Sequence, residues 1–422
     1  MQTEINNSKN KNQPYELPPG WKWVTLGEVC KEIYRYPTYY NISYVSQGIP
    51  EVRGELIKEN GSLESELTKY RFISNETSER YPRTVLREGD FVLSVRGSMG
   101  KVGLVPKELD GANMTANLIR ISPNRAMVYS LFLKQVFLSE YFQRTLDNLS
   151  PQTTIKTIKA PILKSIKIPL PPLPEQRRIA AKIQELMEEV ERARTACKKQ
   201  LEAVKLLPSA YLREVFESEE AKKWERKRLG EVCEINPPRP KNFKRSPDAP
   251  TTFVPMESVN ENTGSITASK IVPYSKVSKG YTYFEENDVL FAKITPCMQN
   301  GKHVIAKNLI DKIGFGTTEF HVLRPSEKII PEWIWYFIRQ PHFLKEATAY
   351  FTGAVGQQRI PVYFLSGYTI PLPPVEVQRR IAADLKEKMA YVEKLRTAIE
   401  KQLEAINALP QVILRKAFRG EL

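Results

Sequence analysis

Residues 168–181 read IPLPPLPEQRRIAA, and residues 370–383 read IPLPPVEVQRRIAA. Eleven of the fourteen positions are identical between the two copies, which lie 202 residues apart. Proline fixes its own backbone angle and lacks an N–H, so a proline run ends the element before it but is tolerated in the first turn of a helix. Each copy therefore predicts the start of a helix.

Apolar residues recur every three or four positions after each proline run, with Glu, Lys and Arg on the other faces. Such a narrow stripe is typical of the seam of a two-helix coiled coil. Its members are Ile179, Ile183, Leu186, Val190, Ala193, Cys197, Leu201 and Val204 in the first copy, and Ile381, Leu385, Met389, Val392, Leu395, Ile399, Leu403 and Ile406 in the second. The repeat continues through KQLEA at 199–203 and 401–405, which indicates that the two helices are related.

A shared Leu-Pro pair follows each apolar stripe, at 207–208 and at 409–410. Proline inside a helix removes a hydrogen bond and clashes with the preceding turn, so we expect both helices to break there. Short second helices are then predicted at 209–216 and 411–418.

The formal net charge of this 422-residue chain is +15, from 63 basic and 48 acidic residues. The two long helical segments, counted as 175–216 and 376–422, hold only +5 of that excess. Most of the positive charge therefore lies in the segments between them. Those segments are the expected binders of a polyanion.

The sequence contains no run of about 18 apolar residues, which predicts no transmembrane segment. Its first twenty residues are polar and rich in asparagine, which argues against a signal peptide. The cysteines Cys30, Cys197, Cys233 and Cys297 form no C-x-x-C pair, so neither a metal site nor a disulfide framework is expected. We therefore expect a cytoplasmic protein with no membrane partner.

Both halves of the chain open in the same way, with a tryptophan (Trp21, Trp224) followed by LGEVC at 26–30 and 229–233. The order is thus globular part, helix, globular part, helix. The predicted segments are a flexible N-terminal extension (1–20), a first globular domain (21–170), a central helix (171–220), a second globular domain (221–372) and a distal helix (373–422).

Each globular domain combines patterns of strands and helices. Turn residues between apolar runs predict a strand–turn–strand unit at 85–105 and again at 287–305, and short helices are expected at 128–146 and 331–347. We therefore expect an α+β fold with two tandem mixed domains separated by a long antiparallel two-helix coiled coil. The expected arrangement is a dumbbell with an approximate two-fold axis, which would match the two-fold symmetry of duplex DNA.

Two variable α/β domains, each followed by a helix that opens with PLPP…Q…IA, resemble the specificity (S) subunit of Type I restriction–modification systems. The resemblance covers nearly the whole chain and is carried by 168–181, 370–383, the LGEVC openings and the KQLEA repeats. One departure is Pro174-Glu175, which becomes Glu376-Val377 in the second copy.

This resemblance implies that the two domains are target recognition domains, each reading one half of a bipartite site in double-stranded DNA. It implies that the helices set the gap between the half-sites and bind two modification (methyltransferase) subunits, which restriction (translocase and endonuclease) subunits join. S-adenosylmethionine then belongs to the methyltransferase partner, and this chain carries no cofactor. The chain itself is expected to be a non-catalytic subunit.

Two stretches of the sequence are close to the motifs of enzymes, but each lacks a residue that the motif requires. Asn236-Pro237-Pro238-Arg239 is close to the Asn-Pro-Pro-aromatic motif of adenine N6 methyltransferases, but Arg239 replaces the ring that stacks on the flipped base. The stretch Gly97-x-x-Gly100-Lys101 lacks the spacing and the Ser/Thr of a phosphate-binding P-loop. The main alternative is a coiled-coil scaffold that assembles other proteins and binds DNA only nonspecifically, and a free-standing methyltransferase ranks third.

Candidate DNA contacts are basic and polar side chains in loops beside predicted strands, because base edges and phosphates are read by Arg, Lys, Asn, Gln, Ser and Thr. In the first domain they are Arg53, Arg96, Ser98, Lys101, Asn113, Thr115, Gln152, Thr153, Thr154 and Lys156. In the second domain they are Lys293, Thr295, Gln299, Lys302, Thr317, Thr318, Gln357, Gln358 and Arg359. The two sets lie at corresponding points of the repeat.

Overall fold

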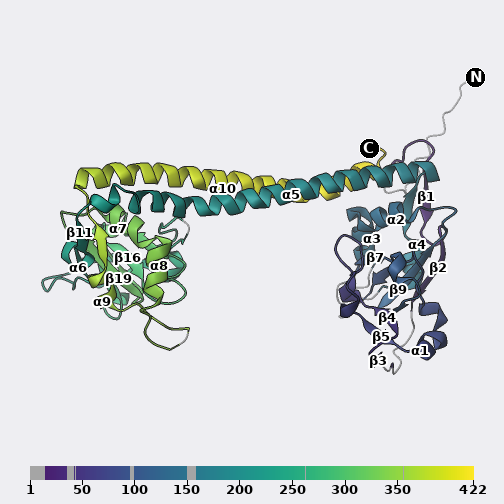
Figure 1. Cartoon of the computed structure of the whole chain (residues 1–422), viewed down its shortest axis with the longest axis horizontal. Coiled ribbons are helices and arrows are strands. Elements are labelled where there is room, and N and C mark those ends of the chain that lie inside the picture. The colour runs from purple at the N-terminus through teal and green to yellow at the C-terminus, as the bar shows by residue number, and fades with distance from the viewer. Residues whose placement is uncertain are drawn as a thin grey trace, which may run out of the picture. The chain divides into compact units, whose positions relative to one another are not determined.

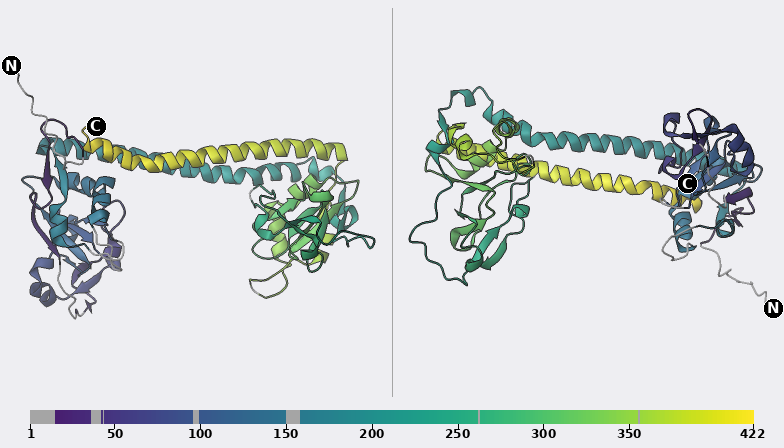
Figure 2. Two further views of the ribbon diagram at one scale, coloured as in Figure 1. Left: turned by 180° about the vertical axis from the view of Figure 1, so that it is seen from behind. Right: turned by 90° about the horizontal axis from the view of Figure 1, so that it is seen from below.

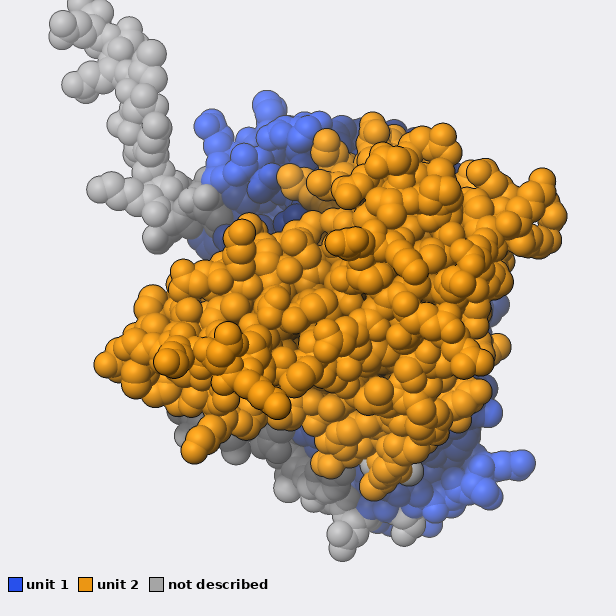
Figure 3. All heavy atoms as spheres, turned by 90° about the vertical axis from the view of Figure 1, so that its left-hand side faces the viewer, with its two compact units in different colours: residues 1–197, 402–422 blue, residues 198–401 orange. Residues whose placement is uncertain are grey.

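The computed structural model describes residues 15–35, 42, 44–95, 99–149, 158–261, 263–354 and 356–422. The chain forms two compact units, coloured separately in Figure 3: unit 1 comprises 1–197 and 402–422, and unit 2 comprises 198–401. Each unit therefore contains one globular domain together with part of each long helix.

Unit 1 has mixed α and β structure, labelled in Figure 1. Its strands are β1 (Lys22–Thr25), β2 (Cys30–Arg35), β3 (Tyr44–Val45), β4 (Ile49–Val52), β5 (Arg71–Ile73), β6 (Phe91–Ser94), β7 (Val102–Leu104), β8 (Asn113–Met114), β9 (Leu118–Pro123) and β10 (Lys167–Leu170). Its helices are α1 (Asn75–Arg80), α2 (Ser130–Leu138), α3 (Glu140–Leu149), α4 (Ala160–Ser165) and the first part of α5 (Leu173–Phe216). The described strands form sheets in the orders β2-β9-β6-β7 and β3-β5-β4-β8, with β1 paired to β10.

Unit 2 repeats most of this plan. Its strands are β11 (Arg226–Arg228), β12 (Cys233–Ile235), β13 (Pro250–Val254), β14 (Lys270–Pro273), β15 (Thr282–Glu285), β16 (Val289–Ala292), β17 (His303–Ile305), β18 (Ile313–Gly316), β19 (Phe320–Pro325) and β20 (Thr369–Pro371). Its helices are α6 (Leu229–Val232), α7 (Pro331–Ile338), α8 (Pro341–Thr348), α9 (Val362–Gly367) and the first part of α10 (Val375–Phe418). The sheet orders are β12-β19-β16-β17 and β14-β13-β18-β15, with β11 paired to β20.

Each domain contains two sheets. One sheet has the same strand order in both domains, and the other sheet differs between the domains at its edge. In both, a central strand pairs antiparallel on one side and parallel on the other: β4 with β5 and β8, and β13 with β14 and β18. Unit 1 adds β3 beside β5, whereas unit 2 adds β15 beside β18, on the opposite edge. The repeated scaffold therefore presents different edges in the two domains.

The strand–turn–strand units predicted at 85–105 and 287–305 are confirmed as the antiparallel pairs β6–β7 and β16–β17. The predicted short helices are confirmed as α2 with α3 and α7 with α8. A buried aspartate shapes the turn before each strand pair, because Asp90 accepts the N–H of Arg87 and Asp288 accepts that of Glu285. This turn chemistry explains why Gly-Asp and Asn-Asp precede the two strands.

The apolar stripe on each long helix has a period of seven residues. Besides Ile179 at its start, the buried stripe members on α5 are Ile183, Val190, Cys197 and Val204, and those on α10 are Leu385, Val392, Ile399 and Ile406. A strict heptad is the pattern that keeps one face of a helix against a partner helix. Ala193, which the sequence placed in the stripe, is exposed. Among the described helices, none is both long and apolar enough to cross a membrane.

Antiparallel pairing of α5 and α10 is present inside each unit, where the segments of the two helices lie side by side in Figures 1 and 2. In unit 1, Arg194 Nε donates to Asn407 Oδ1 at 2.9 Å. In unit 2, Lys388 Nζ lies 5.2 Å from the centre of the Tyr211 ring. The predicted direction of packing is therefore confirmed.

The predicted helix breaks at Pro208 and Pro410 are wrong, because α5 and α10 each continue as one helix of 44 residues. At about 1.5 Å per residue each is roughly 66 Å long. The turns beyond each proline enter a domain core: Leu212 and Phe216 are buried in unit 2, and Leu414 and Phe418 in unit 1. The free energy gained by burying these side chains offsets the loss of the backbone hydrogen bond that each proline removes.

A buried glutamine joins each long helix to its own domain. The Gln176 side chain is fully buried, accepts the N–H of Tyr129 at 2.7 Å, and donates to the carbonyl oxygens of Met127 and Pro171. Gln378 makes the same three bonds in unit 2, with Ile330, Lys328 and Pro373. This shared network explains why the glutamine occurs in both copies of the repeated motif.

Replacing either buried glutamine by alanine should destabilise the unit that contains it. Q176A would leave one N–H and two carbonyl groups without their partner, at a cost of at least about 2 kcal/mol of unfolding free energy. Denaturant titration of the full chain measures this loss. The exposed residues Gln200 and Gln402 supply matched controls, since Q200A and Q402A make the same change on the same helices. Equal losses in test and control variants would contradict the role assigned to the glutamine amide.

Candidate nucleic-acid interface

Two of the candidate threonines, Thr115 and Thr317, lie at equivalent places in the two domains, where two parallel strands end together. In unit 1, Thr115 follows β8, and its N–H donates to the carbonyl of Val52 at the end of β4 at 3.1 Å. In unit 2, Thr317 follows β18 and donates in the same way to Val254 at the end of β13, at 3.4 Å. The repeated backbone thus places both threonines at one corner of their sheets.

The residue after the hairpin strand reaches the same corner in each domain. Val95, after β6, donates its N–H to the carbonyl of Asn117 at 3.0 Å, and Lys293, after β16, donates to that of Glu319 at 2.9 Å. The backbone plan is therefore shared, while the side chains it presents differ. An apolar valine in unit 1 corresponds to a lysine in unit 2.

A third loop completes the corner of unit 2. Ile360 N donates to the carbonyl of Lys293 at 2.9 Å, and Thr295 N donates to that of Gln358 at 3.0 Å. These bonds bring Lys293 and Thr295 against the loop that carries Gln357, Gln358 and Arg359. Lys293 N also donates to the carbonyl of Glu319, beside the two threonines. Six of the nine candidates from the second domain therefore form one polar surface, which we call the Lys293–Arg359 surface: Lys293, Thr317, Thr318, Gln357, Gln358 and Arg359.

Glu319 holds the Arg359 side chain in place. Arg359 donates from Nε and from a terminal nitrogen to the two carboxylate oxygens, both at 2.8 Å. The bonds from Arg359 hold the pKa of Glu319 below its ordinary value, and those bonds raise the pKa of Arg359. The sequence analysis did not select Glu319. An acidic residue directly after two candidate threonines could have indicated an ion pair with a nearby candidate arginine.

The remaining candidates of unit 2 have other surroundings. Gln299 is exposed in the turn between β16 and β17. Lys302 lies in the same turn and forms an ion pair with Glu261 at 3.4 Å. The hydroxyl of Thr295 is buried and has no hydrogen-bond partner within the described part of the chain. Thr295 is therefore tied to the Lys293–Arg359 surface through its backbone N–H alone, and within the described residues the side chains of Gln299 and Lys302 have no hydrogen bond to that surface.

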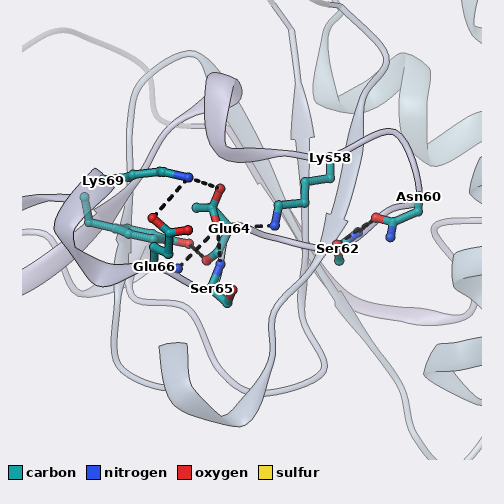
Figure 4. A network of polar contacts seen from close by, with 8 residues as sticks. Lys58, Asn60, Ser62, Glu64, Ser65, Glu66 and Lys69 are labelled. Atoms are coloured by element: carbon teal, nitrogen blue, oxygen red, sulfur yellow. Dashed lines mark hydrogen bonds and ion pairs between the residues drawn. The ribbon is translucent and has the colours of Figure 1, made fainter.

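Arg53 of unit 1 is anchored by the neighbouring loop. It donates to the carbonyl oxygen of Lys69 at 2.9 Å and pairs with Glu55 at 2.5 Å. Figure 4 shows how Glu64 organises that loop by accepting from Lys58 and Lys69 at 3.2 and 3.1 Å. Hydrogen bonding, first from Lys69, lowers the pKa of Glu64 to about 2. The Arg53 side chain is therefore held against a neighbouring loop whose own lysines are engaged internally.

Other candidates of unit 1 lie partly outside the described residues. Lys101 follows the turn between β6 and β7 and pairs with Glu59 at 2.5 Å. Arg96, Ser98, Gln152, Thr153, Thr154 and Lys156 lie outside the residues that the structure describes. For the first domain, the described candidates are therefore Arg53, Lys101, Asn113 and Thr115.

Asn113 has an internal role that the sequence did not indicate. It is 3% exposed, accepts from the Ser78 hydroxyl at 2.7 Å, and donates to the Thr84 hydroxyl at 2.7 Å. Both partners are more than 25 residues distant in sequence, so no local pattern marks this network. We therefore remove Asn113 from the proposed contact residues.

Asn236 of the Asn-Pro-Pro-Arg stretch also has a structural role. It adopts a φ of +55°, which asparagine tolerates better than most residues. Its side-chain oxygen accepts the N–H of Val322 at 2.9 Å, and its nitrogen lies 3.0 Å from Nδ1 of His321. The motif residue thus fixes the end of β12 against β19.

The family comparison matches the two halves of the chain separately. Residues 18–203 and 221–405 both match the model described as Type I restriction modification DNA specificity domain. The chain belongs to this family. Each matched segment covers one globular domain and most of the long helix that follows it, which accounts for the internal repeat.

Curated relatives in the family include the EcoEI specificity subunit of Escherichia coli, a Type I restriction enzyme subunit. It is 35% identical over 192 residues, which are 45% of this chain and 32% of the relative. The match thus spans about a third of that relative's length.

Solved structures match over nearly the whole chain. The HsdS subunit of Thermoanaerobacter tengcongensis has 28% identity and a TM-score of 0.65, covering 97% of this chain and 99% of the other. A chain from work on complex assembly and conformational transition of the type I R-M system has 28% identity and a TM-score of 0.72, with 97% and 100% covered. The α+β fold with two tandem domains and long helices is therefore that of these structures.

The variant N113A should lower stability and leave any recognised DNA sequence unchanged. It leaves the buried hydroxyls of Ser78 and Thr84 without their shared amide, which costs about 1–3 kcal/mol. Thermal or denaturant unfolding measures the loss, and N75A, a change at an exposed position of α1, is the control. A stable N113A protein with altered DNA preference would restore Asn113 as a contact residue.

Proposed function

We propose that this chain is the DNA sequence-specificity subunit of a Type I restriction–modification complex. Each domain reads one half of a bipartite site in double-stranded DNA. The observation that carries the proposal is the double match to a DNA specificity domain, combined with the threonines Thr115 and Thr317 at equivalent strand ends of the two domains. Loops at strand ends suit recognition because their side chains vary without altering the scaffold.

The proposed partners are two methyltransferase subunits, which dock on the long helices, and restriction subunits that join them. S-adenosylmethionine would be held by the methyltransferase partner, and this chain would act without chemistry of its own. The exposed faces of α5 and α10 support docking. The heptad stripe is buried, whereas the charged residues on the other faces of the helices are exposed and available to a partner.

The decisive experiment compares binding to a cognate duplex and to competitor DNA at a stated salt concentration. The cognate sequence comes from mapping methylated adenines in cells that carry this chain and its partner subunits. Strong discrimination supports the proposal. Equal binding to all sequences favours the alternative, a coiled-coil scaffold with only nonspecific DNA binding.

Exchange of one domain should change one half of the methylated motif. Replacing residues 21–165 by the equivalent domain of a relative, with both long helices kept, should alter one half-motif and leave the other intact. The reciprocal exchange of 224–367 should alter the second half alone. The ring centres of Phe132 and Phe418 lie 5.7 Å apart, so the donor domain should keep an aromatic residue at the position equivalent to Phe132. A hybrid that changes both halves would contradict two independent readers.

Lengthening both helices by one heptad should lengthen the gap between the half-motifs. Lys199 and Lys401 are equivalent in the repeat and lie in sequence between the Arg194–Asn407 and Tyr211–Lys388 contacts. Seven residues inserted after each keep the seam in register and add roughly 10 Å, or about three base pairs at 3.4 Å each.

The half-motifs themselves should remain the same in this variant. Three added base pairs also turn one half-site by about 100° around the DNA axis, so methylation should slow. Motif mapping measures both effects. A folded, active variant with an unchanged gap would show that the helices do not set the spacing.

A further inference from the structure

A cavity of about 410 Å³ opens in unit 2 beside the Lys293–Arg359 surface. It lies where the end of β16 and the β18–β19 turn meet the Asn-Pro-Pro-Arg stretch and the segment before β15. The lining side chains that matter here are Lys293, Thr318, Arg239, Tyr281, His321 and Asn236. Its size is in the range of small-molecule sites.

The charged groups in this cavity are all positive. Lys293 and Arg239 line it, and no aspartate or glutamate is among its described lining residues. Arg239 is oriented by bonds from one guanidinium nitrogen to the Tyr274 hydroxyl at 2.8 Å and to the Ser278 carbonyl at 3.0 Å. A cavity with only cations favours an anion.

The ammonium group of Lys293 has neither a hydrogen bond nor an ion pair within the described ranges. Its side chain is half-buried, and burial lowers its pKa, as does the nearby guanidinium of Arg359. Glu319 opposes this shift, but its carboxylate oxygens are already engaged by Arg359. A partly desolvated cation without a partner is unfavourable, and an incoming anion would relieve that cost.

Two other polar side chains of the wall, His321 and Asn236, are engaged with each other and with the backbone. His321 is held by Asn236 at Nδ1 and by the carbonyl of Ile360 at Nε2, 2.8 Å away, and burial keeps its pKa below the ordinary value. Burial therefore disfavours the charged imidazolium form of His321. Donors remain at Lys293 and at the exposed Thr318 hydroxyl. Reading a base edge uses matched donors and acceptors, whereas a phosphate presents acceptors alone.

We infer that this cavity binds a phosphate group of the DNA backbone, with Lys293 as its cation and Thr318 as a hydroxyl donor. The inference rests on the proposed function, which supplies the DNA. It makes Lys293 a positioning residue that sets the register of the second domain on the duplex, while base reading falls to neighbouring side chains such as Gln358 and Arg359. The same phosphate chemistry is available from free inorganic phosphate, so the test separates the two sources.

The test measures dissociation constants of the full chain for cognate and competitor duplexes at several salt concentrations. K293A should weaken binding to both duplexes by the same factor, about three- to tenfold near 0.1 M salt. It should also reduce the slope of log affinity against log salt by about 1. K293R, which keeps the charge, should restore the slope. K345A removes one exposed lysine of α8 and should leave the slope unchanged.

Three results would overturn the inference. Loss of cognate binding alone in K293A, with a relaxed motif, would make Lys293 a base contact. Unchanged binding to both duplexes would show that the cavity does not meet DNA. Thermal stabilisation of the wild type by inorganic phosphate, absent in K293A, with DNA affinity unaltered, would assign the cavity to a free anion. If the wild type itself fails to discriminate cognate from competitor DNA, the proposed function fails, whereas the salt slope on competitor DNA still tests the cavity.

Discussion

A buried side-chain amide at the start of each long helix is the interaction on which the rest of the structure depends. Gln176 and Gln378 each bond one N–H and two carbonyl groups of the loop and proline run beside them. Because an unsatisfied buried polar group is costly, these bonds fix the angle at which the helix leaves its domain. The prolines place the helix start, and the amide attaches it.

Much of the fold could be predicted because it follows from the local spacing of proline, turn and apolar residues. The helix starts, the hairpins and the apolar stripe all follow from spacing within a few residues of each other. The continuation of α5 through Pro208 could not be predicted in this way, because the compensating burial of Phe216 depends on Trp333, more than a hundred residues distant. The opposite placements of β3 and β15 likewise depend on strand pairing over long separations.

The candidate surface was predictable by residue type but not by role. Lys293 and Arg359 could be selected from the sequence as basic loop residues, and the fold joins their loops. Asn113 has the same polar character but lies in a buried network. Asn236, considered in the sequence only as part of an incomplete methyltransferase motif, bonds a strand and a histidine. A polar side chain belongs to the interior or the surface according to its distant partners, which local patterns do not reveal.

The burial of Leu414, Ala417 and Phe418 in the core of unit 1 has a consequence for synthesis of the chain on the ribosome. Unit 2 is a continuous segment, 198–401, so all of its residues have been made before those three appear. At about 5–20 residues per second, some 200 residues take on the order of 10–40 s. Unit 1, which is translated first, therefore cannot complete its core until all of unit 2 has been made. During that interval Phe132, whose ring lies 5.7 Å from that of Phe418 in the finished protein, lacks this neighbour.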